Sequence, residues 1–135
     1  DLLGCHIEAE EICVKWLGAR GSHIEGCLLK TTGMNGKALY IKGRVSFKQT
    51  IQGNIFTAGK RGSDACGIFF DKVEPGTRNA RAVMITGNVF RGFTCAIKSM
   101  TPGVENIRLS CNAFEGNARN VDIPGSGQVR RLTTE

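Results

Sequence analysis

The sequence predicts an all-β chain of about five stacked coils, each built from three short parallel strands. The first reason is a six-residue pattern that occurs five times: an aliphatic residue, a small residue two positions later, then Asn or Cys, and a large apolar residue in sixth place. The copies occupy residues 2–7, 24–29, 51–56, 85–90 and 109–114, so they begin 22, 27, 34 and 24 residues apart. Spacings of this length indicate stacked supersecondary units. The second reason is that apolar residues follow strand periodicity and no helical period.

Each copy is followed by a second apolar strand, and a third strand leads into the next copy. The second strands are 11–14, 38–41, 66–70, 95–97 and 120–123, and examples of the third are 82–85 and 106–109. Apolar residues alternate with period two in the second strands, which predicts one buried face. The alternating pairs are Ile12/Val14, Leu39/Ile41, Cys66/Ile68, Cys95/Ile97 and Val121/Ile123.

Like residues at one repeat position should lie directly above one another. At the fourth position, Asn tolerates the left-handed backbone of a sharp bend, and its side-chain amides can hydrogen-bond along a stack. At the sixth position, aromatic rings should stack in the interior. The expected asparagine column is Asn54, Asn88 and Asn112, with Cys5 and Cys27 in the first two coils; the expected aromatic column is Phe56, Phe90 and Phe114, preceded by Ile7 and Leu29.

Length and charge limit the organisation and the partners. The chain has 135 residues and opens inside a repeat, so we expect a fragment of a longer protein, with the coils at 1–123 and an exit turn and C-terminal tail at 124–135. The net charge of +6 is either solubilising or attracts anionic partners. The scattered basic residues carry no nucleic-acid-binding signature, and no apolar run approaches the length of a membrane span.

The six cysteines and two histidines predict neither disulfides nor a metal site. Two pairs, Cys5/Cys27 and Cys66/Cys95, should be stacked neighbours about 4.8 Å apart, inside disulfide range, but direct pairing between parallel strands strains a bridge. We therefore expect buried thiols that act as small apolar fillers, which favours folding in a reducing cytosol. Because the Cys and His positions do not converge as ligands, we expect no metal and no cofactor, with both histidines on the surface.

The form Ile-x-Gly-Asn-x-Phe, followed by a Gly-bearing bend and an apolar strand, resembles the coil of the right-handed parallel β-helix in the pectate-lyase-like superfamily, which includes bacteriophage tailspikes. The resemblance covers residues 2–123. It implies a polysaccharide-associated protein of a virion tail or of the extracellular space, and tailspikes that this chain resembles are trimers. It leaves the activity open, because this scaffold carries lyases, hydrolases, epimerases and inert stalks.

A site is expected where loops interrupt the regular coils. Insertions at 30–37 and 57–64 should stack into one wall that carries Lys30, Lys37, Lys60 and Arg61, with Asp64 at its edge. A second insertion at 71–81 has a shorter relative at 98–105. We expect a groove over strand 66–70, flanked on one side by Lys60, Arg61 and Asp64 and on the other by Asp71, Glu74, Arg78 and Arg81.

Two reactions fit such a groove. Glycoside hydrolysis needs two carboxylates about 5–5.5 Å or 6.5–9.5 Å apart, and the catalytic candidates are Asp64, Asp71 and Glu74. Elimination from a uronate needs a base and cations that neutralise the sugar's carboxylate, and the substrate-binding candidates are Lys60, Arg61, Arg78 and Arg81. Tyr40 and Trp16 either stack on sugars or pack at a coil corner. The clustered Asp of a lyase calcium site are missing, which disfavours a pectate-lyase mechanism, and ordinary solvated loop charge is the simpler account of these residues.

The fifth repeat position should face outward although it is mostly apolar. Its residues are His6, Leu28, Ile55, Val89 and Ala113. An exposed apolar stripe predicts a subunit contact, here in a homotrimer, whereas a register error of one residue would turn the stripe inward.

The resemblance therefore implies a tailspike-like β-helix that binds a bacterial surface polysaccharide. The positive net charge favours an acidic polysaccharide. If the chain is an enzyme, it would depolymerise this polymer. Two alternatives remain open at this point. One is a non-catalytic structural or adhesive stalk, and the other is a uronate-polysaccharide lyase or epimerase. Neither nucleic acid nor membrane insertion is expected.

Overall fold

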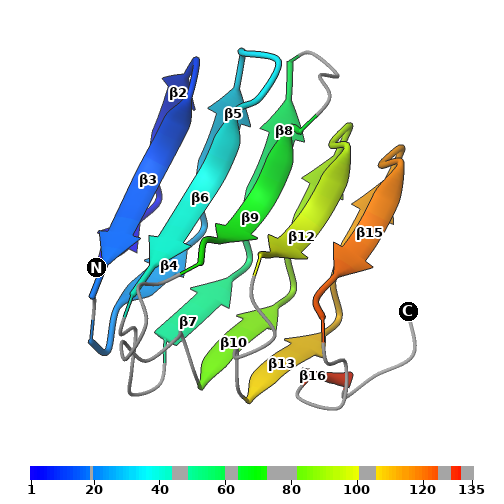
Figure 1. The fold of residues 1–135 in the computed structure, drawn as a ribbon. Helices are drawn as coiled ribbons and strands as arrows, with labels where there is room; N and C mark the ends of the chain where they lie inside the picture. Colours follow the sequence, from blue (N-terminus) through cyan, green and yellow to red (C-terminus); the bar gives the residue numbers. More distant parts are fainter. Residues whose placement is uncertain are drawn as a thin grey trace.

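The computed structural model describes residues 1–18, 20–43, 49–59, 64–72, 82–100, 106–124 and 129–131. In these ranges every helix or strand element is a strand, and the strands wind into a parallel β-helix (Figure 1). Five coils of three strands each confirm the predicted fold class. A sixteenth strand begins a further coil at the C-terminal end.

The strands form three parallel sheets, and each strand pairs with the strand one coil away. Sheet A contains β1 (Leu2–Leu3), β4 (His23–Glu25), β7 (Gln49–Gln52), β10 (Val83–Thr86), β13 (Ile107–Ser110) and β16 (Val129–Arg131). Sheet B contains β2 (His6–Ala9), β5 (Leu28–Thr31), β8 (Ile55–Ala58), β11 (Val89–Arg91) and β14 (Ala113–Glu115). Sheet C, whose strands cross the front of Figure 1 from blue to orange, contains β3 (Ile12–Leu17), β6 (Lys37–Lys42), β9 (Cys66–Phe70), β12 (Cys95–Ser99) and β15 (Arg119–Asp122).

The asparagine column forms a continuous buried hydrogen-bond ladder at the bend between sheets A and B. Asn54 Nδ2 donates to Asn88 Oδ1 at 3.0 Å, and Asn88 Nδ2 donates to Asn112 Oδ1 at 3.0 Å. The same two oxygens accept the backbone N–H groups of Asn54 and Asn88, at 2.9 and 3.1 Å. Each side chain therefore satisfies backbone groups that the bend would otherwise leave unpaired in the interior.

The left-handed residue of this bend is not Asn, which corrects one expectation. Positive φ occurs at the preceding position, occupied by glycine in four coils, with φ of 63° at Gly53 and 64° at Gly87, and by Cys111 in the fifth, with φ of 54°. Glycine adopts this conformation without the steric cost that a Cβ imposes. Asn is required one residue later for its hydrogen bonds.

Cysteine takes over part of the Asn role in the second coil. Cys27 Sγ accepts the backbone N–H of Cys5 at 3.4 Å and donates to the carbonyl of Leu2 at 3.5 Å. These are the sulfur equivalents of the bonds that Asn54 makes to Cys27 N and to Ile24 O. All six cysteines are free thiols in the structure, but only Cys27, Cys66 and Cys95 are buried as expected, whereas Cys5 and Cys13 are half-buried and Cys111 is exposed.

The aromatic column is the centre of the core. Phe56 and Phe90 stack with ring centroids 4.7 Å apart, and Phe90 and Phe114 with centroids 5.4 Å apart. Leu29 continues the column in register with Phe56. The side chains of Leu29, Phe56 and Phe90 are fully buried. Burial of such side chains, at about 1.5–3 kcal/mol each, is the main source of stability in the coils.

Sheet C breaks the alternation that the sequence suggested. Ala96 and Ile97 both belong to the interior core, so the preceding residue, Cys95, is turned to the other face. Cys95 and its in-register neighbour Cys66 pack with Phe69 in a separate cluster, against Tyr40. The prediction that Cys66/Ile68 and Cys95/Ile97 share one buried face is therefore wrong for the two cysteines.

Two further predictions concern the outside and the end of the helix. The fifth repeat position is in register and faces outward, with Ile55 38% exposed and Leu28 and Val89 half-buried. In the C-terminal tail, β16 pairs in parallel with β13, so residues 129–131 form an exit strand on sheet A.

Candidate functional site

The outer face of sheet C combines aromatic rings with lysines. One register row contains Lys15, Tyr40, Phe69 and Lys98 on β3, β6, β9 and β12. The rings of Tyr40 and Phe69 are stacked, with centroids 5.9 Å apart. Lys15 Nζ lies 5.2 Å from the centre of the Tyr40 ring, and Lys37 Nζ lies 5.1 Å from that of Phe69, both inside cation–π range. We call these five residues the sheet C face.

Asp64 links three coils at one edge of this face. Its Oδ2 is 3.1 Å from Lys37 Nζ and its Oδ1 is 3.0 Å from Lys98 Nζ. Lys37 also donates to the backbone oxygen of Asp64 at 2.8 Å. Burial raises the pKa of Asp64, but the hydrogen bonds from Lys98 and Lys37 outweigh it and hold the pKa below the usual value. The carboxylate is therefore ionised at neutral pH and engaged as a bridge between coils.

Asp71 is engaged at the opposite end of β9. Its Oδ2 accepts a short hydrogen bond from the Tyr40 hydroxyl, and its Oδ1 accepts the backbone N–H of Lys72 at 2.8 Å. Burial first, and then the hydrogen bond and negative charge of Asp71, raise the pKa of Tyr40 to about 12. Tyr40 therefore stays a neutral hydrogen-bond donor, and its ring orientation is set by Asp71.

A hollow of 340 Å³ opens beside Tyr40 and Lys37. Its walls are the coil-one corner with Glu10 and Glu11, and the coil-two insertion with Met34. The insertion lies directly on the corner, because its Gly33 approaches the Glu10 carbonyl so closely that a Cβ would be 2.4 Å from that oxygen. The backbone N–H of Gly33 donates to the same carbonyl at 3.0 Å. The hollow is thus shaped by hydrogen-bonded backbone.

The structure places the predicted site residues in different situations. Tyr40, Asp64 and Asp71 all lie around β9, where the groove was expected. Lys60, Arg61, Glu74, Arg78 and Arg81 lie outside the described residues, so their roles stay predictions. Trp16 packs against the interior core, which favours packing over sugar stacking.

Asp64 and Asp71 have separate partners at opposite ends of β9. The Cα atoms of a five-residue strand such as Cys66–Phe70 span about 13 Å from first to last, beyond the 5–9.5 Å carboxylate separation of glycosidases. The arrangement that we can see favours positioning and binding by these two residues. A catalytic pair would need a carboxylate such as Glu74.

Sequence reasoning missed Glu10 and Glu11, which line the hollow, and did not give Lys15 and Lys98 a role. Both glutamates precede a strand in the first coil, in which no insertion was recognised. Their position in the hollow depends on the insertion of the next coil folding back over them. No sequence signal reveals that contact, because it is set by loop geometry.

The thiols of Cys66 and Cys95, which pack with Phe69 of the sheet C face, are poor nucleophiles. Burial and the nearby carboxylate of Asp64 raise the pKa of Cys66 to about 12, and burial also raises the pKa of Cys95. Both remain protonated at neutral pH. Across the described ranges, no three His, Cys, Asp or Glu side chains come close enough together to hold a metal ion. Nor does any described segment form a helix long and apolar enough to cross a membrane.

Comparison with known proteins gave no match to any protein-family model, to any curated protein or to any solved structure. Fold and site geometry therefore carry the functional argument.

Proposed function

We propose that this chain is a tailspike-like β-helix module that binds an acidic surface polysaccharide along the sheet C face, with an uncharged part of one sugar unit in the hollow beside Tyr40, where Glu10 and Glu11 favour hydroxyl groups over a carboxylate. The observation that supports the proposal most directly is the continuity of the two features. Tyr40 and Lys37 line the hollow and also belong to the face, so a glycan chain leaving the hollow meets stacked rings and lysines.

The chemistry of the face suits an anionic glycan. Sugar rings present apolar C–H surfaces to aromatic side chains, and lysines near them neutralise carboxylates. Lys15 is exposed and makes no ion pair within the part of the chain that the structure describes. The net charge of +6 adds a general attraction for an acidic polymer.

Depolymerisation of the polysaccharide is a separate proposal, because Asp64 and Asp71 are engaged with lysines and Tyr40 and do not form a catalytic pair by themselves. Release of reducing ends from the polysaccharide would identify a hydrolase, and absorbance of an unsaturated uronate product would identify a lyase. Binding without either product would favour an adhesive module, and absence of binding would favour a stalk.

The test of binding compares retention on an acidic polysaccharide, such as polygalacturonate, with retention on neutral dextran. Lys15→Gln and Tyr40→Ala should each weaken retention several-fold, and added salt should weaken it further. Lys30→Gln is the matched control, because Lys30 lies on sheet B, paired with Glu8. Equal retention of Lys15→Gln and Lys30→Gln would contradict binding at the sheet C face.

A further inference from the structure

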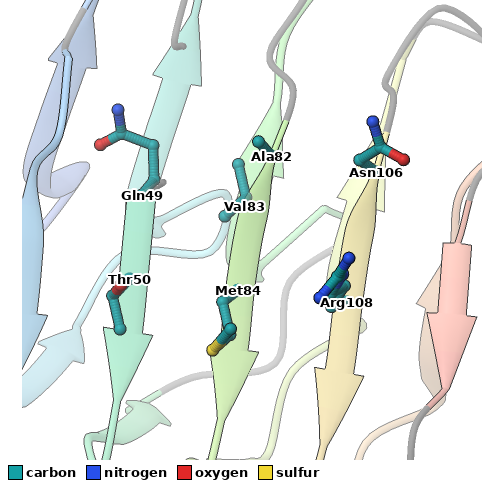
Figure 2. Close-up of a pocket in the computed structure, with 7 residues that line it drawn as sticks. All are labelled: Gln49, Thr50, Ala82, Val83, Met84, Asn106 and Arg108. Atoms are coloured by element: carbon teal, nitrogen blue, oxygen red, sulfur yellow. The ribbon is translucent and has the colours of Figure 1, made fainter. Parts of the chain in front are cut away.

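A second, larger hollow of 540 Å³ lies on sheet A, away from the sheet C face. It is built from corresponding positions of three consecutive coils, on β7, β10 and β13. Figure 2 shows its lining in two rows across these strands. The first row contains Gln49, Ala82, Val83 and Asn106, and the second contains Thr50, Met84 and Arg108.

The second row provides side chains for contact with a ligand. Met84 pairs in register with Thr50 on one side and Arg108 on the other. Met84 is 38% exposed, Arg108 is exposed and Thr50 is half-buried. The row therefore presents a hydroxyl, a polarisable apolar surface and a cation side by side, about 4.8 Å apart from strand to strand.

The first row provides a rigid rear wall. Gln49 is fully buried, and its Oε1 accepts the backbone N–H of Ser22 at 2.8 Å. Ala82 and Asn106 occupy the left-handed region, with φ of 56° and 53°. Asn tolerates that region well, but alanine adopts it only at a steric cost from its Cβ. Ala82 is held there in part by the bond from Gln49 N to its carbonyl at 3.1 Å, and strained backbone of this kind is concentrated at functional sites.

Arg108 is the one charged residue among those that line the hollow. None of the lining residues is acidic, and no carboxylate pairs with Arg108 within the ranges that the structure describes. An exposed guanidinium in such surroundings is suited to bind a carboxylate through two parallel hydrogen bonds.

From these observations we infer that the sheet A hollow binds a small ring-bearing carboxylate. The carboxylate meets Arg108, the ring lies on Met84, and Asn106 and Thr50 bind polar groups on the ring. A thioether contacts the face or edge of an aromatic ring favourably and also packs on the C–H face of a sugar. The expected ligand is therefore a ring that carries one carboxylate. An aromatic acid and a uronic acid both meet this description.

The three methionines of the chain allow a direct test by NMR of the full chain labelled at the methionine methyl groups. Met84 reports on the sheet A hollow, Met34 reports on the hollow beside Tyr40, and Met100 serves as an exposed reference. The probes are benzoate and glucuronate, each compared with its neutral counterpart, benzamide or glucose. A shift of Met34 alone would support the proposed function and contradict this inference, so the two can fail separately.

We expect at least one of the two carboxylates to shift the Met84 signal in a saturable way, with an affinity at least 10-fold above that of its neutral counterpart, the range expected for a charge-assisted hydrogen bond. Arg108→Gln should lower that affinity by about 10-fold or more. Arg91→Gln is the matched control, because Arg91 lies on sheet B and pairs with Glu115. The inference is overturned if neither carboxylate shifts Met84, if the neutral counterparts bind equally well, or if Arg108→Gln and Arg91→Gln have the same effect.

Discussion

Replacing Asn88 by alanine tests the central feature of the fold, the asparagine ladder. Asn88 Oδ1 accepts the backbone N–H of Asn54 at 2.9 Å and its side-chain Nδ2 at 3.0 Å. Asn54 is 1% exposed, so water cannot replace the missing acceptor without opening the coil. Asn88→Ala leaves one backbone donor and one amide hydrogen of Asn54 unpaired, although Asn54 Nδ2 keeps its bond to Ile24 O.

Each buried unpaired donor costs about 1–3 kcal/mol, so Asn88→Ala should lower the free energy of unfolding by about 2–6 kcal/mol. This is a large part of the roughly 5–15 kcal/mol that stabilises a typical domain. Urea unfolding followed by circular dichroism is the assay. With a slope of about 2 kcal/mol per molar urea, a loss of 4 kcal/mol moves the midpoint by about 2 M.

Asn120→Ala is the control, because Asn120 is exposed and the bond that it accepts from Asn117 Nδ2 is long at 3.5 Å. It should change stability by less than about 0.5 kcal/mol. Hydrogen exchange adds a local readout: the Asn54 amide should exchange faster in Asn88→Ala, while the Cys27 amide keeps its acceptor, Asn54 Oδ1. The reasoning is refuted if Asn88→Ala and Asn120→Ala are equally stable.

Four further predictions follow from other parts of the chain. Tyr40 is the one tyrosine, so ultraviolet titration should show a single phenol midpoint near pH 12, and Asp71→Asn should move that midpoint towards 10. Because the pKa of Tyr40 is higher in the folded state, the contact with Asp71 contributes fully to stability below about pH 10 and loses its contribution as pH rises to 12. A wild-type midpoint near pH 10 would contradict the contact. Asp64→Asn should cost about 1 kcal/mol at pH 7; since the pKa of Asp64 is lowered on folding, the difference from wild type in chemical denaturation should shrink as pH falls below 4, and a constant difference would count against the bridge. Cys111→Gly removes a Cβ from a residue in the left-handed region and should raise the free energy of unfolding by up to about 1 kcal/mol in the same assay. A lower free energy of unfolding would argue against backbone strain at Cys111. Light scattering should show a trimer that Ile55→Lys converts to a monomer, whereas a wild-type monomer at high concentration would reject the apolar stripe as a subunit contact.

The ladders were predictable because a β-helix makes its contacts between residues one repeat apart. The register of Asn54 with Asn88, and of Phe56 with Phe90, follows from the repeat position alone. The role of the Gly–Asn pair was predicted only in part. Sequence reasoning gave the left-handed conformation to Asn, although glycine accepts it at no steric cost and the Asn amide is needed for hydrogen bonds.

The neighbourhood of three candidate residues was predictable, but the position of the hollow was not. Tyr40 lies on the strand next to β9, and Asp64 and Asp71 flank β9, whereas the hollow opens beside Tyr40 and the first coil. The partners of those residues were not predictable, because Lys98 and Lys37 reach Asp64 from neighbouring coils. The outward turn of Cys66 and Cys95 was also hidden, since it depends on two consecutive inward residues that interrupt the alternation of the strand.

By itself, the sequence determined the number of coils, the three strands of each and the residues that stack through the interior. It could do so because every interior contact repeats the same short pattern, and that pattern is written in the chain. Only the tertiary structure decided the two hollows, the bridging of Asp64 and the row of Met84 and Arg108 on sheet A. Those features depend on how loops of unequal length and side chains from different coils meet on the outer surface, where no repeated packing constraint ties one position to the next.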